Sequence, residues 1–175
     1  MFLGKLGNDG KHWYDELLLE SRAFFRVENK FGSLVLENVK KKDNGTYTCR
    51  VDFQTAPTKI TNIHLGVIIR PERPQIYDEI GRVVKNKIGP FKVEDTVTLM
   101  CLVTTGDPKP EVTWWKDHIL VDATFKNDTS RVENEIVIGP LKKRDWNAVY
   151  TCQANNNNIS VPQSTSVKLD MTCNI

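Results

Sequence analysis

Four cysteines are the side chains of this chain best suited to covalent or metal chemistry, and their spacing limits what they can do. They lie at positions 49, 101, 152 and 173 and include no C-x-x-C pair, and the three histidines lie far from all of them. Tetrahedral zinc sites use closely spaced pairs of such ligands, so the pattern predicts no metal site. Disulfide formation is the chemistry that remains.

Sequence motifs of enzymes are absent from the chain. It has no nucleophile elbow, no P-loop, no H-E-x-x-H and no dinucleotide fingerprint. We therefore predict that the protein is not an enzyme and has no catalytic residue and no cofactor. The 24 Lys and Arg residues nearly balance the 22 Asp and Glu residues, so a net charge of +2 does not point to nucleic acid as a partner.

The composition suits a folded chain of one domain or two small ones. Hydrophobic residues make up 39% and charged residues 26% of the 175 residues, far from the profile of a disordered chain. No apolar stretch approaches the roughly 20 residues of a membrane-spanning helix, and the first residues do not resemble a signal peptide. From these features alone we expect a cytosolic protein or a piece of something longer.

An internal repeat links two of the cysteines. Leu36–Cys49 and Ile138–Cys152 each read as an apolar strand end, a basic turn, an Asp, and then Tyr-x-Cys. The second copy has one extra residue after its Asp, and the two cysteines lie 103 positions apart. That interval is the length of one immunoglobulin domain, about 100 residues.

Both copies carry a tyrosine two residues before the cysteine. This is the tyrosine corner at the start of strand F of an immunoglobulin domain, where the phenol bonds back to the preceding turn and the cysteine faces the opposite sheet. Tyr47 and Tyr150 therefore mark the start of two such strands, and Cys49 and Cys152 are expected to face two cores.

The second copy keeps the rest of the immunoglobulin pattern. Cys101 lies in an alternating strand, Thr96–Val103, and Trp114 follows it by 13 residues. Cys101, Trp114 and Cys152 form the Cys…Trp…Cys pattern of an immunoglobulin core. We predict a disulfide between Cys101 and Cys152.

The first copy has no cysteine before Cys49, and only about 70 residues precede the Pro71–Pro74 segment. We interpret it as a truncated V-type domain. Arg22 precedes Asp43 by 21 residues, a spacing that suits an ion pair between the start of strand D and the turn before strand F. The alternative is that Trp13, 36 residues before Cys49, marks a strand C in this segment.

We predict an all-β chain of tandem immunoglobulin-like β-sandwiches, the first of them incomplete. The expected parts are a partial V-type domain at 1–70, a Pro-rich linker at 71–74, a complete domain of the C2 or I type at 75–170, and a tail or further linker at 171–175. Cys49 lacks a partner in its own domain, and the role of Cys173 is left open.

Several short motifs resemble the junction of the first two immunoglobulin domains of the arthropod Sidestep family. They include Cys49–Phe53 (C-R-V-D-F), Pro71–Pro74 (P-E-R-P), Glu94–Leu99 and Val112–Trp115, and the similarity covers nearly the whole chain. Sidestep proteins are multi-domain cell-surface receptors with a transmembrane helix, and they act in motor-axon guidance by binding Beaten-path immunoglobulin proteins. Trp146, in the lengthened second turn, and Cys173 depart from the family's pattern.

The resemblance implies a fragment of a cell-surface receptor ectodomain that mediates adhesion or axon guidance. Its expected partners are ectodomains of other immunoglobulin-superfamily proteins, of the Beaten-path kind. Two alternatives stay open, namely a secreted immunoglobulin-domain recognition protein and a truncated gene product without a function of its own.

A partner-binding face is expected on the outer side of strands F and G of the first domain. If Tyr47 and Cys49 face the core, alternation places Ile63 of strand G inward as well. The residues of opposite parity then form a mixed outer patch, which consists of Arg50, Asp52, Ile60, Asn62 and His64. Such a patch suits a protein contact, although an ordinary solvated strand face is the alternative. Trp115 is a second candidate anchor, unless it packs under a nearby loop.

Basic runs occupy the same turn in both copies, at Lys40–Lys42 and Lys142–Arg144. We expect solvated cationic turns, with contact to a sulfated glycan as the alternative.

Three Asn-x-Ser/Thr sequons are candidate N-glycosylation sites in a secreted chain, at Asn44, Asn127 and Asn158. Asn44 is the least expected of them, because it lies inside the tyrosine corner.

Overall fold

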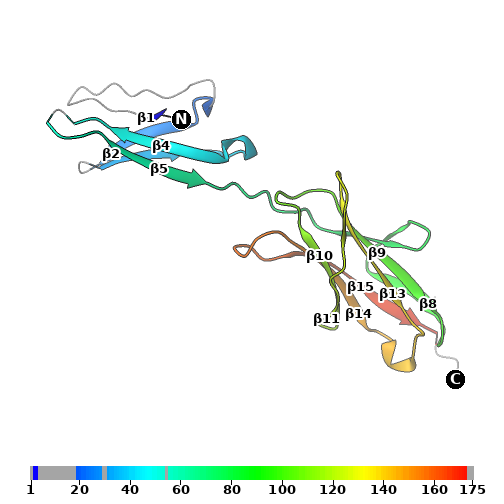
Figure 1. The fold of residues 1–175 in the computed structure, drawn as a ribbon. Coiled ribbons are helices and arrows are strands. Elements are labelled where there is room, and N and C mark those ends of the chain that lie inside the picture. The colour runs from blue at the N-terminus through cyan, green and yellow to red at the C-terminus, as the bar shows by residue number, and fades with distance from the viewer. Residues whose placement is uncertain (1, 4–18, 29–30, 54, 173–175) are drawn as a thin grey trace. The chain divides into compact units, whose positions relative to one another are not determined.

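The computed structural model describes residues 2–3, 19–28, 31–53 and 55–172. The chain divides into two compact units, the first ending at Val67 and the second beginning at Ile68 (Figure 1). Trp13 and Cys173, whose roles were left open above, lie outside the described residues.

Two five-stranded sheets build the second unit. In sheet order, the first consists of β12 (Lys126–Asn127), β13 (Val132–Ile138), β9 (Val97–Val103), β6 (Gln75–Asp78) and β7 (Val83–Val84). The second consists of β11 (Ile119–Asp122), β10 (Glu111–Lys116), β14 (Val149–Asn155), β15 (Gln163–Met171) and β8 (Lys87–Phe91). All neighbours are antiparallel except β15 and β8, which pair in parallel. The order is that of an immunoglobulin sandwich, with its A-B-E-D sheet facing its C-F-G sheet.

Alternation of apolar and polar residues fixes which side of each strand faces the core. In β9 every second residue from Val97 to Val103 is buried, while the residues between them are partly exposed. β13 follows the same rule but places an amide, Asn134, among its buried side chains. The predicted parity of the Cys101 strand is therefore correct.

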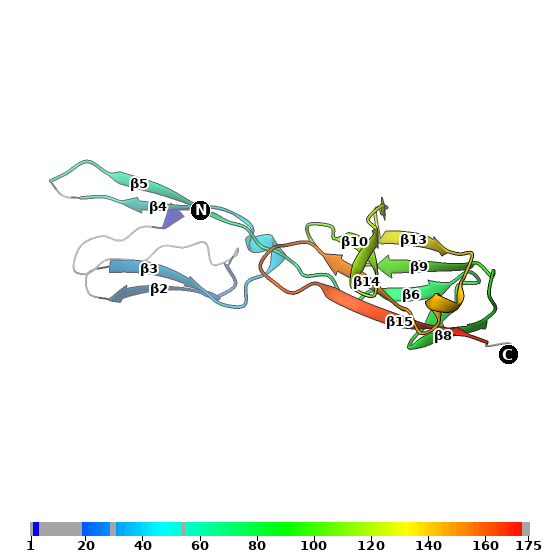
Figure 2. The same ribbon diagram turned by 90° about the horizontal axis from the view of Figure 1, so that it is seen from below.

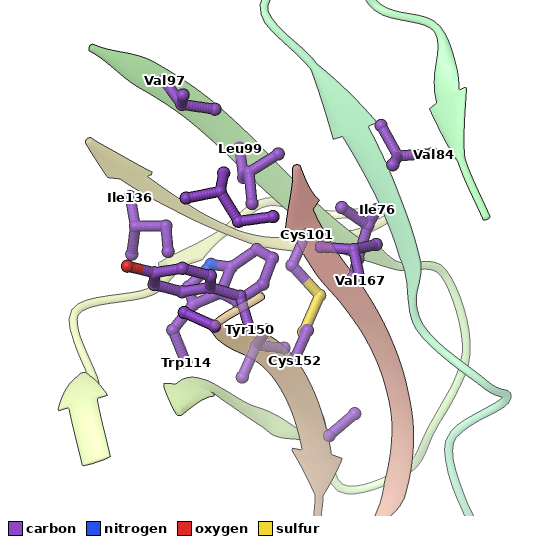
Figure 3. Close-up of a cluster of buried hydrophobic side chains, with 14 of the residues drawn as sticks. Ile76, Val84, Val97, Leu99, Cys101, Trp114, Ile136, Tyr150, Cys152 and Val167 are labelled. Carbon is purple, nitrogen blue, oxygen red and sulfur yellow. A yellow bond between two sulfur atoms is a disulfide. The ribbon is translucent and has the colours of Figure 1, made fainter. Parts of the chain in front are cut away.

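Trp114 and the Cys101–Cys152 disulfide lie in the middle of the core (Figure 3). The disulfide joins β9 of one sheet to β14 of the other, which confirms the predicted pairing. Trp114 is 0% exposed, and its indole Nε1 donates to the Asn134 carbonyl at 3.0 Å. The Asn134 side-chain Nδ2 donates in turn to the Val112 carbonyl at 2.9 Å, so these two hydrogen bonds connect the sheets in both directions.

Residues 68–74 belong to the second unit, whereas the sequence predicted a domain end at 70 followed by a linker. Ile69 and Asp107 exchange two backbone hydrogen bonds, of 2.8 and 2.9 Å. The Glu72 N–H donates to Thr105 Oγ1 at 2.7 Å, and the ring of Pro74 is buried. The segment is held against the loop that joins β9 to β10, because its backbone groups find partners there.

The same turn precedes strand F in both units. A single turn of 3-10 helix, η1 (Lys41–Asp43) or η2 (Lys143–Asp145), ends in an aspartate. The carboxylate of that aspartate accepts the backbone N–H three residues earlier, at 2.7 Å in the first copy and 2.8 Å in the second. Each turn thus closes on its own buried aspartate.

The tyrosine corner forms in the first copy and is replaced in the second. The Tyr47 hydroxyl donates to the Asp43 carbonyl at 2.8 Å. In the second copy the equivalent carbonyl, that of Asp145, accepts the Ala148 N–H at 3.1 Å, because the extra residue brings this N–H into range. Tyr150 is buried without that bond among the described residues, and the Lys116 ammonium lies 5.7 Å from its ring centre.

Two layers are visible in the first unit (Figure 2). One is an antiparallel hairpin of β2 (Ala23–Glu28) and β3 (Phe31–Leu36). The other is a sheet with the order β1-β4-β5, in which β4 (Gly45–Val51) pairs antiparallel with β5 (Lys59–Leu65) and parallel with β1 (Phe2–Leu3).

The described part of the first unit has only a partial core. Ile63 was expected to face inward, yet it is 58% exposed, because the described strands provide no layer that covers this end of β5. Cys49 is half-buried and its thiol is free. The expected inward-facing side of the β4–β5 hairpin is therefore open to solvent in part.

Removing the disulfide tests its contribution to the second unit. The double variant Cys101→Ala/Cys152→Ala should lose about 4 kcal/mol of unfolding free energy, because the crosslink closes a loop over a sequence separation of 51 residues. Urea denaturation followed by Trp fluorescence measures the loss. Cys49→Ala is the matched control and should leave this transition unchanged.

Candidate functional site

The β4–β5 hairpin brings the five predicted face residues together. Its register pairs Thr46 with His64, Thr48 with Asn62, and Arg50 with Ile60. Directly opposite residues point to the same side of a sheet, so these three rows form one continuous outer face. We call it the hairpin face, and it consists of Thr46, Thr48, Arg50, Asp52, Thr58, Ile60, Asn62 and His64.

Side-chain hydrogen bonds order two rows of the hairpin face. Thr46 Oγ1 and His64 Nδ1 lie 3.0 Å apart, and Thr48 Oγ1 donates to Asn62 Oδ1 at 2.9 Å. Each pair holds its polar groups in fixed positions, and of the four side chains only Thr48 is half-buried. A partner would therefore meet a partly preorganised polar surface.

A small charged cluster ends the hairpin face. Arg50 Nε donates to the two Asp52 oxygens at 3.0 and 3.1 Å, and the Thr58 hydroxyl donates to Asp52 Oδ1 at 2.6 Å. The Thr58 hydroxyl and the Arg50 guanidinium lower the pKa of the Asp52 carboxyl. Ile60 beside this cluster is 58% exposed. The face thus combines an ion pair, amide and hydroxyl groups and an aliphatic side chain.

Trp115 is not part of the hairpin face. It lies on β10 in the second unit and is half-buried, and its indole Nε1 donates to Thr113 Oγ1 at 2.9 Å. Its cross-strand neighbours are Thr151 on β14 and Leu120 on β11, so the ring lies on the outer side of its sheet. Its role as an anchor stays a prediction.

A buried ion pair positions the start of the hairpin. Arg22 Nη1 donates to Asp43 Oδ2 and Nη2 donates to Oδ1, both at 2.8 Å, so the pair expected from the 21-residue spacing forms. Nη1 also donates to the carbonyls of Glu37 and Asn38, at 3.2 and 2.9 Å. The guanidinium therefore joins the start of β2, the end of β3 and the turn before β4.

The electrostatics of this pair follow from its contacts. Hydrogen bonds from Arg22 hold the pKa of the Asp43 carboxyl at about 2, although burial opposes them. Glu20 lies outside the pair, 3.6 Å from Arg22 Nε, and binds the ammonium groups of Lys40 and Lys42. These two lysines lower the pKa of the exposed Glu20 carboxyl to about 2. One carboxylate thus pairs with two of the three lysines of the first basic turn.

In the second unit a lysine, not an arginine, pairs with the buried aspartate of the turn. Lys116 of β10 binds the carboxylate of Asp145 at 2.5 Å. Burial raises the pKa of this carboxyl, but the hydrogen bonds from Lys116 and from the Lys142 backbone outweigh it, so the pKa lies below its usual value. Lys116 could not be predicted from the spacing, because the interval between this lysine and Asp145 differs from that between Arg22 and Asp43.

Sequence reasoning also missed Thr46, Thr58 and Glu20. Thr46 shares the parity of Arg50, so the alternation along β4 could have predicted that it faces outward. Thr58 lies outside both strands, and Glu20 is far from its lysine partners in the sequence. No local pattern identifies these two residues.

The three candidate glycosylation residues are all exposed. Asn127 lies on β12 and Asn158 lies in the loop between β14 and β15. The side-chain Oδ1 of Asn44 accepts the Val67 N–H at 3.1 Å. Glycosylation of all three stays a prediction, and Asn44 would have to give up this hydrogen bond.

Within the described ranges, no group of three or more His, Cys, Asp or Glu side chains could hold a metal ion. The same part of the chain contains no helix that is long and apolar enough to cross a membrane.

Comparison with known proteins agrees with the strand order. Residues 82–156 match the immunoglobulin domain family. The chain carries tandem immunoglobulin-like domains. Over 147 residues it is 26% identical to junctional adhesion molecule A of Homo sapiens, in a match that covers 78% of this chain and 46% of that protein. It is also 31% identical over 137 residues to Roundabout homolog 1 of Rattus norvegicus, covering 78% of this chain and 8% of that protein.

A solved structure shows the same fold. The ectodomain of mouse nectin-like molecule 4 matches with a TM-score of 0.60 at 19% sequence identity, covering 86% of this chain and 50% of that chain. The immunoglobulin-domain chain spans less than half the length of the two curated relatives above.

The Arg22–Asp43 pair predicts a specific titration. Carbon-detected NMR of the side-chain carboxyl should give Asp43 a pKa of about 2, against an ordinary value of 3.8. Because the folded pKa is the lower one, ionised Asp43 stabilises the unit above about pH 4, and this contribution is lost as the pH falls through about 2.

Arg22→Gln should raise the Asp43 pKa toward its ordinary value. Arg50→Gln is the control, since Arg50 pairs with Asp52 and not with Asp43. An Asp43 midpoint that stays the same after Arg22→Gln would contradict the assignment.

Proposed function

We propose that this chain is part of the ectodomain of a Sidestep-like cell-surface receptor that mediates adhesion or axon guidance. In this proposal it binds ectodomains of other immunoglobulin-superfamily proteins, of the Beaten-path kind, and it works at the plasma membrane or outside the cell. Binding, and not turnover of a substrate, is the activity.

The observation that carries this proposal is the hairpin face. Its residues are exposed except Thr48, which is half-buried, and hydrogen bonds already order its polar side chains. Interfaces between proteins are typically such mixtures of aliphatic, amide and charged groups. The similarity to immunoglobulin-domain proteins, one of them named as an adhesion molecule, supports a protein partner.

Arg50 and His64 are the residues that we expect to matter most. Arg50 offers a guanidinium at one end of the face and His64 an imidazole at the other, with Asn62 between them. A partner that contacts both ends would cover Ile60 and exclude water from the Arg50–Asp52 pair, which strengthens charged contacts.

A binding screen tests the proposal. The chain is applied to cells that display single immunoglobulin ectodomains, Beaten-path-like ones among them, and bound protein is measured against concentration. We expect saturable binding to at least one of them, and a loss of affinity of about tenfold or more in Arg50→Ala/His64→Ala.

Thr61→Ala is the matched control, because Thr61 lies on the same strand but points to the opposite side. Equal losses in both variants would show that the hairpin is perturbed as a whole and would count against the face. Absence of saturable binding to every ectodomain, from a chain that melts cooperatively, would favour the secreted recognition protein instead.

A further inference from the structure

The basic turns of the two units differ in how many of their positive charges are paired with carboxylates. Lys142 directly before η2, and Lys143 and Arg144 within this single 3-10 turn, are all exposed. Among the described residues none of these three cations forms an ion pair with a carboxylate. Three adjacent positive charges therefore face solvent.

Among the described residues, no ion pair joins the acidic groups around this turn to its three cations. Asp145, the only acid within the turn, is buried and binds Lys116 and the Lys142 backbone. Asp95 of the neighbouring turn accepts the Lys92 N–H. Glu94, whose backbone N–H donates to the Leu141 carbonyl, forms no ion pair with the three cations within the described ranges.

An aromatic side chain accompanies the free charges. Trp146 follows the turn directly and is 57% exposed, and its backbone N–H donates to the Lys143 carbonyl at 3.3 Å. Covering an exposed indole gives a large favourable free energy, so Trp146 is available to pack against a bound ligand. Trp146 is the residue at which the turn departs from the first copy, where Asn44 holds the equivalent position.

The first turn serves as an internal comparison. It has the same 3-10 geometry and the same aspartate closure, but Lys40 and Lys42 bind Glu20. It also lacks an exposed aromatic at the position of Trp146. The second turn therefore differs from the first in two ways: its cations have no carboxylate partner among the described residues, and an exposed indole follows them.

We infer that the turn of Lys142, Lys143, Arg144 and Trp146 is a binding site for a sulfated polysaccharide. The three cations pair with sulfate groups spaced along the chain of sugars, and the indole packs on the apolar face of a sugar ring. Basic runs of this kind bind heparin-like chains, and here the fold presents the run on a rigid turn. This site lies in a different unit from the hairpin face and does not depend on the proposed protein partner.

Binding of the whole chain to immobilised heparin tests the inference. We expect Lys142→Ala/Lys143→Ala/Arg144→Ala to weaken binding by about tenfold or more, and to reduce its dependence on salt, because charge pairs at the surface are screened over about 8 Å at physiological ionic strength. Trp146→Ala should weaken binding by about threefold to tenfold with the salt dependence unchanged, because the indole contact is apolar.

The matched control is Lys40→Ala/Lys41→Ala/Lys42→Ala, which removes the same charge from the first turn and should change binding little. Circular dichroism of each variant checks that the folds persist. Equal losses in the two triple variants would overturn the inference, since they would indicate attraction to the overall charge. So would binding to vesicles rich in phosphatidylserine without binding to heparin, or equal binding to desulfated heparin.

Discussion

A buried aspartate inside a basic turn is the constraint on which both units depend. A buried carboxylate is stable only if cations and N–H groups surround it, and each unit supplies one cation from a residue distant in the sequence. This turn also determines the residue at which strand F begins. Since side chains alternate along a strand, that one position decides which residues of β4 reach the hairpin face and which residues of β14 reach the core.

The two copies of the turn differ by one inserted residue, and their hydrogen bonds and ion pairs differ as well. In the shorter copy the Asp43 carbonyl is free to accept the Tyr47 hydroxyl, and the cations around it are drawn to Glu20. In the longer copy a backbone N–H donates to the equivalent carbonyl, and an exposed Trp146 takes the position that Asn44 holds in the shorter copy. The first unit thus offers a strand face for recognition and the second offers a turn.

Strand parity, the disulfide and the Arg22–Asp43 pair could be predicted because each follows from period-two alternation or from a fixed spacing within the domain. Glu20, Lys116 and the buried amide of Asn134 could not, since their partners are brought close only by tertiary packing. The outward position of the face residues followed from parity, whereas the exposure of Ile63 did not, because it depends on which strands lie opposite. The segment 71–74, predicted to be a linker, lies in the second unit, where the Glu72 N–H donates to Thr105 Oγ1 and Pro74 is buried.

The parallel pairing of β8 with β15 has a mechanical consequence. Lys87 at the start of β8 is paired with Lys168 near the end of β15, and the two strands run in the same direction. Tension that enters the second unit at its first strands and leaves after Met171 pulls these two strands past each other along their length. Their hydrogen bonds are then loaded together in shear and must break nearly at once, which resists force better than opening them one after another.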